Sequence, residues 1–257
     1  MAAQKQSVGG LGPKFNPKIL LYGDPGQGKT TFAGSYTKGK THVYNFDPQG
    51  LSVLRENIND ITADVFSDTD HKKGDTYNQF WKQLQKDDKD GLFKELYESE
   101  GLVVFDSYTS LENYMVDYVA LNILKKKPTS DGVYHIERQD WPKVTPYVIN
   151  FFKVVTALPC AVLVVCHRKS IQDADANLFF RPTIIGQQAE QTARWFSEYL
   201  RCSLRNGKFI MQTQGNTINP AGSRLFLPGS GVKSLTDPTL DDLYDYWHTG
   251  KLNCKHS

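Results

Sequence analysis

The amino-acid sequence predicts an α/β fold in which helices cover both faces of a mostly parallel central sheet and a C-terminal antiparallel hairpin extends that sheet. An apolar run at residues 19–22 leads into a loop spaced G-x-x-x-x-G-K-T, the pattern of a strand, a phosphate-binding loop and a helix. Two further apolar runs, 102–105 and 161–165, resemble strands that are buried on both faces. Asn206 and Gly207 separate two β-rich runs, which is the strongest short hairpin signal.

The chain length indicates one main domain with two tails. A chain of 257 residues can bury a full core, and α/β folds of this size are commonly single units. Residues 1–17 are polar and rich in glycine and proline, which favours a flexible arm, although Leu11 or Phe15 could dock on a neighbouring subunit. The main domain is expected over residues 18–235, followed by a short helix and a tail over residues 236–257.

The composition narrows the range of partners. The formal net charge is +2, so bulk electrostatics do not demand nucleic-acid binding, and any such surface must come from local patches. The four cysteines show neither C-x-x-C spacing nor a metal-ligand spacing with histidine, which indicates reduced thiols. There is no secretory pattern and no apolar run long enough to cross a membrane, so we expect a cytoplasmic protein without a membrane partner.

The loop after the first predicted strand has the composition of a phosphate cradle. Its glycines permit backbone angles that residues with a Cβ avoid, so successive N–H groups can turn toward an anion. The helix that begins near Lys29 adds its positive end, the Lys29 ammonium would reach the β- and γ-phosphates, and the Thr30 hydroxyl would bind Mg²⁺. The expected cofactors are therefore ATP and Mg²⁺, with an ordinary glycine-rich turn as the alternative. The expected nucleotide-binding residues are Gly23, Asp24, Pro25, Gly26, Gln27, Gly28, Lys29, Thr30 and Thr31.

The next segments are expected to supply further groups near the γ-phosphate. A first helix is predicted over residues 31–36 and a β-rich second strand over residues 41–47. Because ligands lie outside the C-terminal ends of parallel strands, Asp47 and Gln49 are expected close to the phosphates. A short strand at 61–66 and a helix from about 77 to 98 follow. The helix has a charged interruption at residues 86–91, which is more simply a solvated helix break than a binding site.

A carboxylate closes the next buried strand. Residues 102–105 are all apolar and are followed by Asp106, at the strand tip where a second Mg²⁺ contact, usually through water, is expected. The pairing of such a strand with a phosphate loop is more specific than either motif alone. The alternative is that Asp106 caps the helix predicted over residues 108–124.

Two basic segments are candidates for contact with single-stranded DNA. Three adjacent lysines before a Pro- and Gly-containing loop form the densest positive patch, for which a solvated surface loop is the simpler interpretation and contact with nucleic-acid phosphates the alternative. Residues 168–185 lack clear periodicity, are expected to form a long loop, and combine basic with aromatic side chains, which suits bases that stack and phosphates that meet cations. The candidate DNA-binding residues are Lys125, Lys126, Lys127, Arg168, Lys169, Phe179, Phe180 and Arg181.

The last third of the chain is expected to complete the sheet. A helix over residues 140–158 precedes a buried strand that ends at His167, which is either a satisfied buried imidazole or a sensor of the γ-phosphate. A short helix over residues 187–196 precedes the hairpin strands 198–205 and 208–214.

The order of these parts resembles the RecA fold. More narrowly it is similar to the compact phage-encoded RecA-like P-loop ATPases of the Sak/RadA-like group, which are linked to single-strand annealing and recombination. The resemblance spans about residues 18–227 and implies a nucleotide held between subunits of a filament or ring. It also implies that Arg224 is a finger that reaches a neighbour's γ-phosphate and that the two basic segments face DNA. The motifs that carry it are 23–30, 45–48, 103–107, 139–141, 164–167 and 219–224.

One departure from RecA predicts slow hydrolysis. RecA has a glutamate two residues after the aspartate of the second strand, whereas this chain has Gln49, which can orient a water molecule but cannot take its proton. Ser107 stands where many P-loop ATPases have another glutamate. Asp47 is then a weaker candidate base. The expected catalytic residues are Lys29, Gln49, Asp47, His167 and Arg224.

Two functions of different class follow from these expectations. The first is an ATPase that binds single-stranded DNA, is stimulated by it, and acts in phage recombination or annealing as a homo-oligomeric ring or filament. The second is a nucleotide-gated assembly or binding protein in which ATP orders subunits and turnover is incidental.

Overall fold

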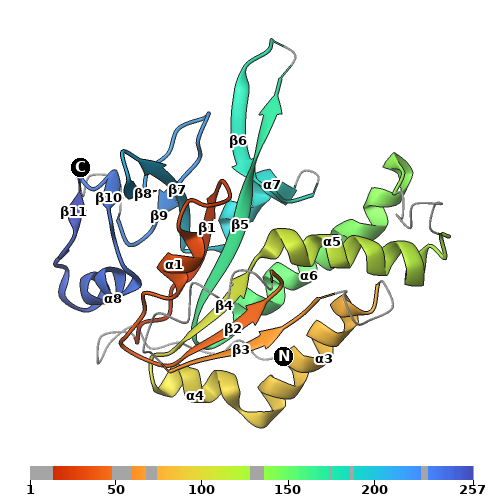
Figure 1. Ribbon diagram of the computed structural model, residues 1–257, viewed down its shortest axis with the longest axis horizontal. Coiled ribbons are helices and arrows are strands. Elements are labelled where there is room, and N and C mark those ends of the chain that lie inside the picture. The colour runs from red at the N-terminus through yellow and green to blue at the C-terminus, as the bar shows by residue number, and fades with distance from the viewer. Residues whose placement is uncertain are drawn as a thin grey trace, which may run out of the picture.

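The computed structural model describes residues 14–47, 60–67, 74–127, 136–173, 175–185, 188–226 and 231–256. A single mostly parallel sheet runs through the molecule, with strand order β3-β2-β4-β5-β1-β7-β8-β10-β11 (Figure 1). The strands are β1 (Lys18–Gly23), β2 (Thr41–Asn45), β3 (Ile61–Val65), β4 (Leu102–Asp106), β5 (Ala161–Gln172), β6 (Leu178–Pro182), β7 (Glu198–Arg205), β8 (Lys208–Gln212), β9 (Gly222–Ser223), β10 (Ser234–Thr236) and β11 (Lys255–His256). The predicted α/β class is confirmed.

The helices lie on both faces of the sheet. The α-helices are α1 (Lys29–Ala33), α3 (Thr76–Asp90), α4 (Leu92–Glu98), α5 (Tyr108–Tyr118), α6 (Trp141–Ala157), α7 (Gln188–Gln191) and α8 (Leu240–Thr249). A π-helical turn (Val119–Ile123) continues α5, and 3₁₀ turns precede α6 (Arg138–Asp140) and follow α7 (Thr192–Trp195). In the described parts of the chain, no helix combines the length and the apolar composition that a membrane crossing requires.

The apolar strands bury both of their faces because successive side chains point to opposite sides. Leu20 and Tyr22 of β1 belong to a core that includes buried residues of α3, α4, α5 and α6. Ile19 and Leu21 belong to a second core, which includes buried residues of α1 and α8. Strand β5 lies between β1 and β4, so the strand that carries the phosphate loop and the strand that ends at Asp106 are not direct neighbours.

Glycine divides the helix that was predicted over residues 77–98. Gly91 has φ of 87° and ends α3, and α4 begins at the next residue. The predicted helix break within residues 86–91 is confirmed, because the left-handed conformation that glycine adopts at low cost terminates the first helix.

The expected long loop over residues 168–185 is instead largely a β-hairpin. Strand β5 continues to Gln172, and β6 pairs with it in antiparallel register, with Ser170 opposite Phe180. Figure 1 shows this β5–β6 hairpin extending away from the rest of the molecule. Its turn is held by Asp173, whose carboxylate accepts hydrogen bonds from Asn177. The segment lacks sequence periodicity, so its strands could not be predicted from the sequence. The hydrogen bonds between β5 and β6 stabilise them instead.

The predicted hairpin around Asn206 and Gly207 is confirmed. Strands β7 and β8 pair in antiparallel register around Asn206 and Gly207, whose φ angles are 51° and 73°. A two-residue turn with both central φ angles positive matches the twist of the flanking strands, which explains the Asn-Gly sequence.

Both ends of the described chain pack on the main domain. Phe15 is buried, with its ring near those of Tyr36, Tyr244 and Trp247, so the expectation that it docks on a neighbouring subunit is corrected. Leu11 lies outside the described residues. Helix α8 begins with a reciprocal capping box between Thr239 and Asp242, and β11 then pairs with β10.

Candidate active site

The loop between β1 and α1 has a shape that depends on glycine. Gly26 and Gly28 have φ angles of 72° and 81°, in the left-handed region that residues with a Cβ rarely adopt. A Cβ on Gly23 would lie 2.5 Å from the Cys202 Sγ atom and 2.8 Å from the Cys202 carbonyl oxygen. The loop therefore lies directly against β7 and turns sharply into the N-terminus of α1.

Two side chains of the loop bind to neighbouring strands and thereby stabilise its conformation. The Asp24 carboxylate forms two contacts with the Arg168 guanidinium, at 2.8 Å to Nε and 2.7 Å to Nη2. The Gln27 side-chain Oε1 atom accepts a hydrogen bond from the backbone N–H of Leu204. These bonds join the loop to β5 and β7, so its backbone donors are arranged before any ligand arrives, which is the condition for strong electrostatic stabilisation.

Lys29 is buried beneath the loop, with an exposed fraction of 6%. Its Nζ atom donates to the carbonyl oxygens of Gly23 at 3.1 Å and Asp24 at 2.7 Å. Burial lowers the Lys29 pKa, and the neighbouring carboxylates of Asp106 and Asp24 oppose that shift. An ammonium group has three donors, so a third can reach a phosphate oxygen.

Thr30 and Asp106 form a pair of adjacent oxygen donors. The Thr30 hydroxyl donates to the Asp106 Oδ2 atom at 2.6 Å. Burial raises the Asp106 pKa, the bond from Thr30 and the charge of Lys29 lower it, and the charge of Asp47 raises it. Mg²⁺ prefers hard oxygen ligands and would offset the cost of a buried carboxylate, so these two residues fit the metal that the motif implies.

The alternative role of Asp106 as a helix cap is not observed. Ser107 is the N-cap of α5, and its hydroxyl accepts a hydrogen bond from the backbone N–H of Ser110 at 3.2 Å. Because Ser107 supplies the cap, the Asp106 carboxylate is directed to Thr30 instead.

Asp47 and His167 lie near the same pair. His167 is opposite Gly23 in the register of β5 and β1, and its backbone N–H donates to the Thr109 hydroxyl at 2.9 Å. Burial and then the charge of Lys29 lower the His167 pKa, whereas Asp47 raises it. The imidazole is half-buried and is favoured in its neutral form near pH 7, so it can donate or accept a hydrogen bond beside the loop.

The other two predicted catalytic residues are Gln49 and Arg224. Gln49 lies outside the described residues. Arg224 follows β9, whose Ser223 pairs with Glu198 of β7, and Glu198 is opposite Ile19 near the beginning of β1. Arg224 therefore lies at the N-terminal edge of the parallel strands, whereas the phosphate loop leaves the C-terminal edge. This placement separates Arg224 from the nucleotide site of its own chain, so a contact with a γ-phosphate would have to be made in another subunit.

The candidate DNA-binding residues lie in two places. Lys125 and Lys127 are exposed after the π-helical turn, and Lys126 forms ion pairs with Asp140 and Glu137. Residues 128–132 lie outside the described part of the chain. The others lie on the β5–β6 hairpin, and most of their polar groups already have partners. These partners are Asp24 and the Phe180 ring for Arg168, the Ile184 carbonyl for Lys169, and the carbonyls of Phe180, Thr217 and Ile218 for Arg181.

Sequence reasoning missed the buried carboxylate of Glu112 on α5. Its Oε1 atom accepts hydrogen bonds from the Tyr108 hydroxyl and the Ile185 backbone N–H, both at 2.9 Å. Burial raises the Glu112 pKa to about 7, and the two hydrogen bonds oppose that shift. The available signal was an acid adjacent to Leu111 on the apolar side of the predicted helix.

The Glu112→Gln variant is expected to change how stability depends on pH. Because the folded pKa of about 7 exceeds the unfolded value, the wild-type contribution is fully present below the unfolded pKa and is lost as pH rises to about 7. Glutamine keeps the accepting oxygen without titrating. From about pH 4 to pH 8, the free energy of unfolding of the variant should therefore rise by about 3 kcal/mol relative to that of wild type. Urea unfolding at both pH values measures this difference. The exposed Glu95→Gln change is the control, and parallel pH profiles for the Glu112 variant and wild type would contradict the expectation.

The fold and the site together define a P-loop nucleoside triphosphatase. A family model described as an AAA domain matches residues 16–225, and the chain belongs to that family. This membership indicates a nucleotide-binding ATPase, for which ATP and Mg²⁺ are the typical ligands. No curated protein matches the chain.

Proposed function

We propose that this ATPase binds single-stranded DNA, is stimulated by it, and acts in recombination or annealing, as the resemblance to the compact phage-encoded RecA-like ATPases implies. The observation that carries the proposal is the connection between the β5–β6 hairpin and the phosphate loop. Arg168 of the hairpin forms two contacts with Asp24 of the loop, and its guanidinium lies over the Phe180 ring at 4.1 Å. A ligand on the hairpin can therefore bias the loop through one side chain.

The chemistry assigned to the nucleotide site is hydrolysis of the terminal phosphate. Lys29 would neutralise the phosphate oxygens, while Thr30 and Asp106 would hold Mg²⁺, which supplies charge stabilisation when bound. Gln49 would orient the attacking water, with Asp47 as a weaker base and His167 as a sensor of the terminal phosphate. The neutral amide of Gln49 cannot accept the proton, so turnover is expected to be slow. A neighbouring subunit's Arg224 would complete the charge stabilisation in a ring or filament.

The hairpin has the composition that single-stranded nucleic acid requires. Phe179 and Phe180 are half-buried, and the Arg181 guanidinium lies 5.7 Å from the Phe179 ring centroid. Bases stack on aromatic rings without a sequence preference, and arginine adds attraction for the bases and phosphates. Lys125 and Lys127 would add sequence-independent phosphate contacts.

ATP hydrolysis measured with and without single-stranded DNA tests the proposal. We expect DNA to stimulate turnover at about 50 mM salt and to stimulate it less at about 200 mM. The reason is that the release of counterions contributes less to DNA affinity as the salt concentration rises. The Phe179→Ala variant should weaken DNA binding about 5-fold to 150-fold, because one stacked base contributes about 1–3 kcal/mol. Fluorescence anisotropy of a labelled oligonucleotide measures that binding.

A tyrosine variant is the control for the loss of the aromatic ring. Phe179→Tyr keeps an aromatic face and should bind DNA as wild type does.

The Lys125→Ala, Lys127→Ala double variant should make DNA binding less dependent on salt. The slope of the logarithm of the binding constant against the logarithm of the salt concentration should fall in magnitude by about 1.4, because each phosphate contact on a single strand contributes about 0.7. A double variant of Lys82 and Lys94, which lie on α3 and α4, removes the same charge and should not change the slope. Turnover that is indifferent to DNA at both salt concentrations contradicts the proposal.

A second candidate function is a nucleotide-gated assembly protein. Large apolar side chains are exposed on the hairpin and beside it: Ile171 (41%), Leu178 (51%), Leu204 (49%) and Ile218 (46%). Such a group favours contact with another protein surface, including a second copy of the chain. If ATP converts monomers to a larger assembly by light scattering while DNA has no effect on turnover, this candidate replaces the first.

A further inference from the structure

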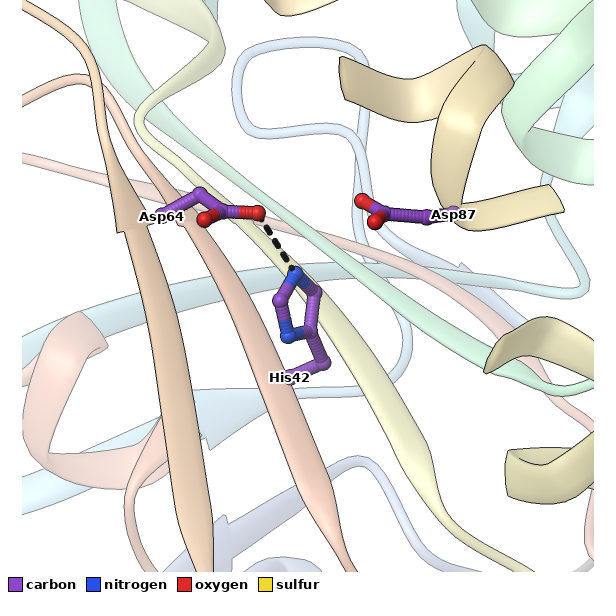
Figure 2. Close-up of side chains that lie close together, drawn as sticks. All are labelled: His42, Asp64 and Asp87. Atoms are coloured by element: carbon purple, nitrogen blue, oxygen red, sulfur yellow. Dashed lines mark ion pairs between the residues drawn. The ribbon is translucent and has the colours of Figure 1, made fainter. Parts of the chain in front are cut away.

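Three potential metal ligands meet on the sheet face that α3 covers. His42 lies on β2, Asp64 on the edge strand β3 and Asp87 on α3, and one ligand atom from each lies within 4.8 Å of the others. Figure 2 shows the two carboxylates directed toward the His42 ring from either side. None of these residues belongs to the nucleotide site.

The His42 side chain is only 9% exposed and points into this cluster. Its Nε2 atom lies 3.3 Å from the Asp64 Oδ2 atom, yet it forms no hydrogen bond within the parts of the chain that the structure describes. Its Nδ1 atom lies 2.8 Å from the Thr62 hydroxyl. When Nδ1 donates to that hydroxyl, the lone pair of Nε2 faces the carboxylates, which is the arrangement of a metal-bound histidine with its second nitrogen held.

The Asp87 carboxylate is held in place by hydrogen bonds that leave capacity for a cation. The Tyr44 hydroxyl donates to Oδ2, and the Gln83 amide donates to Oδ1 at 2.8 Å. Each carboxylate oxygen has two lone-pair sites, so each can accept one more partner. Supporting bonds of this kind orient carboxylates that bind metals.

We propose that His42, Asp64 and Asp87 bind a divalent first-row transition-metal cation, with Zn²⁺ as the best match. One imidazole nitrogen and two carboxylate oxygens form a set that suits zinc, with water as the fourth ligand. Two ligands at about 2 Å from a tetrahedral metal are about 3.3 Å apart. The His42 and Asp64 atoms already have this separation, so only the Asp87 carboxylate must move closer.

The cation would fasten the edge of the sheet. β3 pairs only with β2 in the described sheet, and its five residues are partly exposed. A metal bound by side chains of β2, β3 and α3 would join the edge strand to its neighbour and to the covering helix. The half-exposed Asp64 gives the ion a path from solvent. His42 and Tyr44 lie on the face of the sheet opposite to α1, the helix that follows the phosphate loop. Because the metal site and the nucleotide site are separate, binding of the cation would not require a nucleotide.

Calorimetric titration of chelator-treated, nucleotide-free protein with ZnCl₂ tests the site. Wild type should bind one Zn²⁺ at this site, and Zn²⁺ should raise the unfolding temperature. Affinity should fall in the order Zn²⁺, Mn²⁺, Mg²⁺. Each of the variants His42→Gln and Asp64→Asn should weaken Zn²⁺ binding by about 10-fold to 100-fold or more and abolish the thermal shift.

His248 provides the matched control. Its Nε2 atom lies 3.3 Å from the Glu100 Oε1 atom, so it forms a histidine–carboxylate pair of the same length. His248→Gln should leave Zn²⁺ binding unchanged. If His42→Gln does not fold, the Asp64→Asn variant, at a more exposed position, decides the question. Zn²⁺ binding that is absent from wild type, or equally strong in the Asp64 variant, overturns the proposal and leaves His42 and Asp64 as an ion pair.

Discussion

Lys29→Ala is expected to reduce ATP turnover about 10²-fold to 10³-fold, the usual cost of removing one group that stabilises charge in the transition state. The Lys29 ammonium lies beneath the loop and is held by the Gly23 and Asp24 carbonyls, so no solvent cation can take its place with the same geometry. The variant should also fail to retain ATP in magnesium buffer. Equilibrium binding of a fluorescent ATP analogue and steady-state phosphate release measure the two effects.

Lys40→Ala is the control for the loss of one lysine. Lys40 is exposed and pairs with Glu95 on the surface, where an ion pair contributes little. This variant should bind and hydrolyse ATP as wild type does. Retention of ATP by the Lys29 variant at the wild-type level would contradict the assignment of the phosphate loop, and circular dichroism would show whether the variant is folded.

Asp106→Asn is expected to remove the magnesium dependence of nucleotide binding and to lower turnover by about 10²-fold or more, since the metal supplies several kcal/mol of charge stabilisation. Asparagine has the same shape, and its oxygen can still accept the bond from Thr30. Burial raises the Asp106 pKa, so the ionised carboxylate is unfavourable without a cation. The nucleotide-free variant should therefore be at least as stable as wild type, although Mg²⁺ and ATP together no longer stabilise it.

Thermal unfolding with and without Mg²⁺ and ATP separates these two effects. Asp60→Asn, at an exposed position just before β3, is the matched control and should respond to the ligands as wild type does. A lower unfolding temperature of the nucleotide-free Asp106 variant, with magnesium-dependent turnover intact, would indicate a structural role instead.

The nucleotide site could be predicted in large part because its motifs are local. The glycines, Lys29 and Thr30 are close in sequence, and Asp106 directly follows an apolar run that only a buried strand explains. The pairing of residues 168–182 was not predicted, because a cross-strand partner leaves no periodic signal.

The sequence by itself determined the alternation of strands and helices, the phosphate loop and the candidate magnesium ligands, since each of these motifs depends on residues that adjoin in the chain. Only the tertiary structure decided the contacts between distant residues. It joined Asp24 to Arg168, 144 residues away, put Arg224 at the opposite edge of the sheet, and gathered His42, Asp64 and Asp87. The physical reason is that strand order and register determine which side chains meet. The strand order and register are in turn stabilised by the burial of the whole core, which a local stretch of sequence does not reveal.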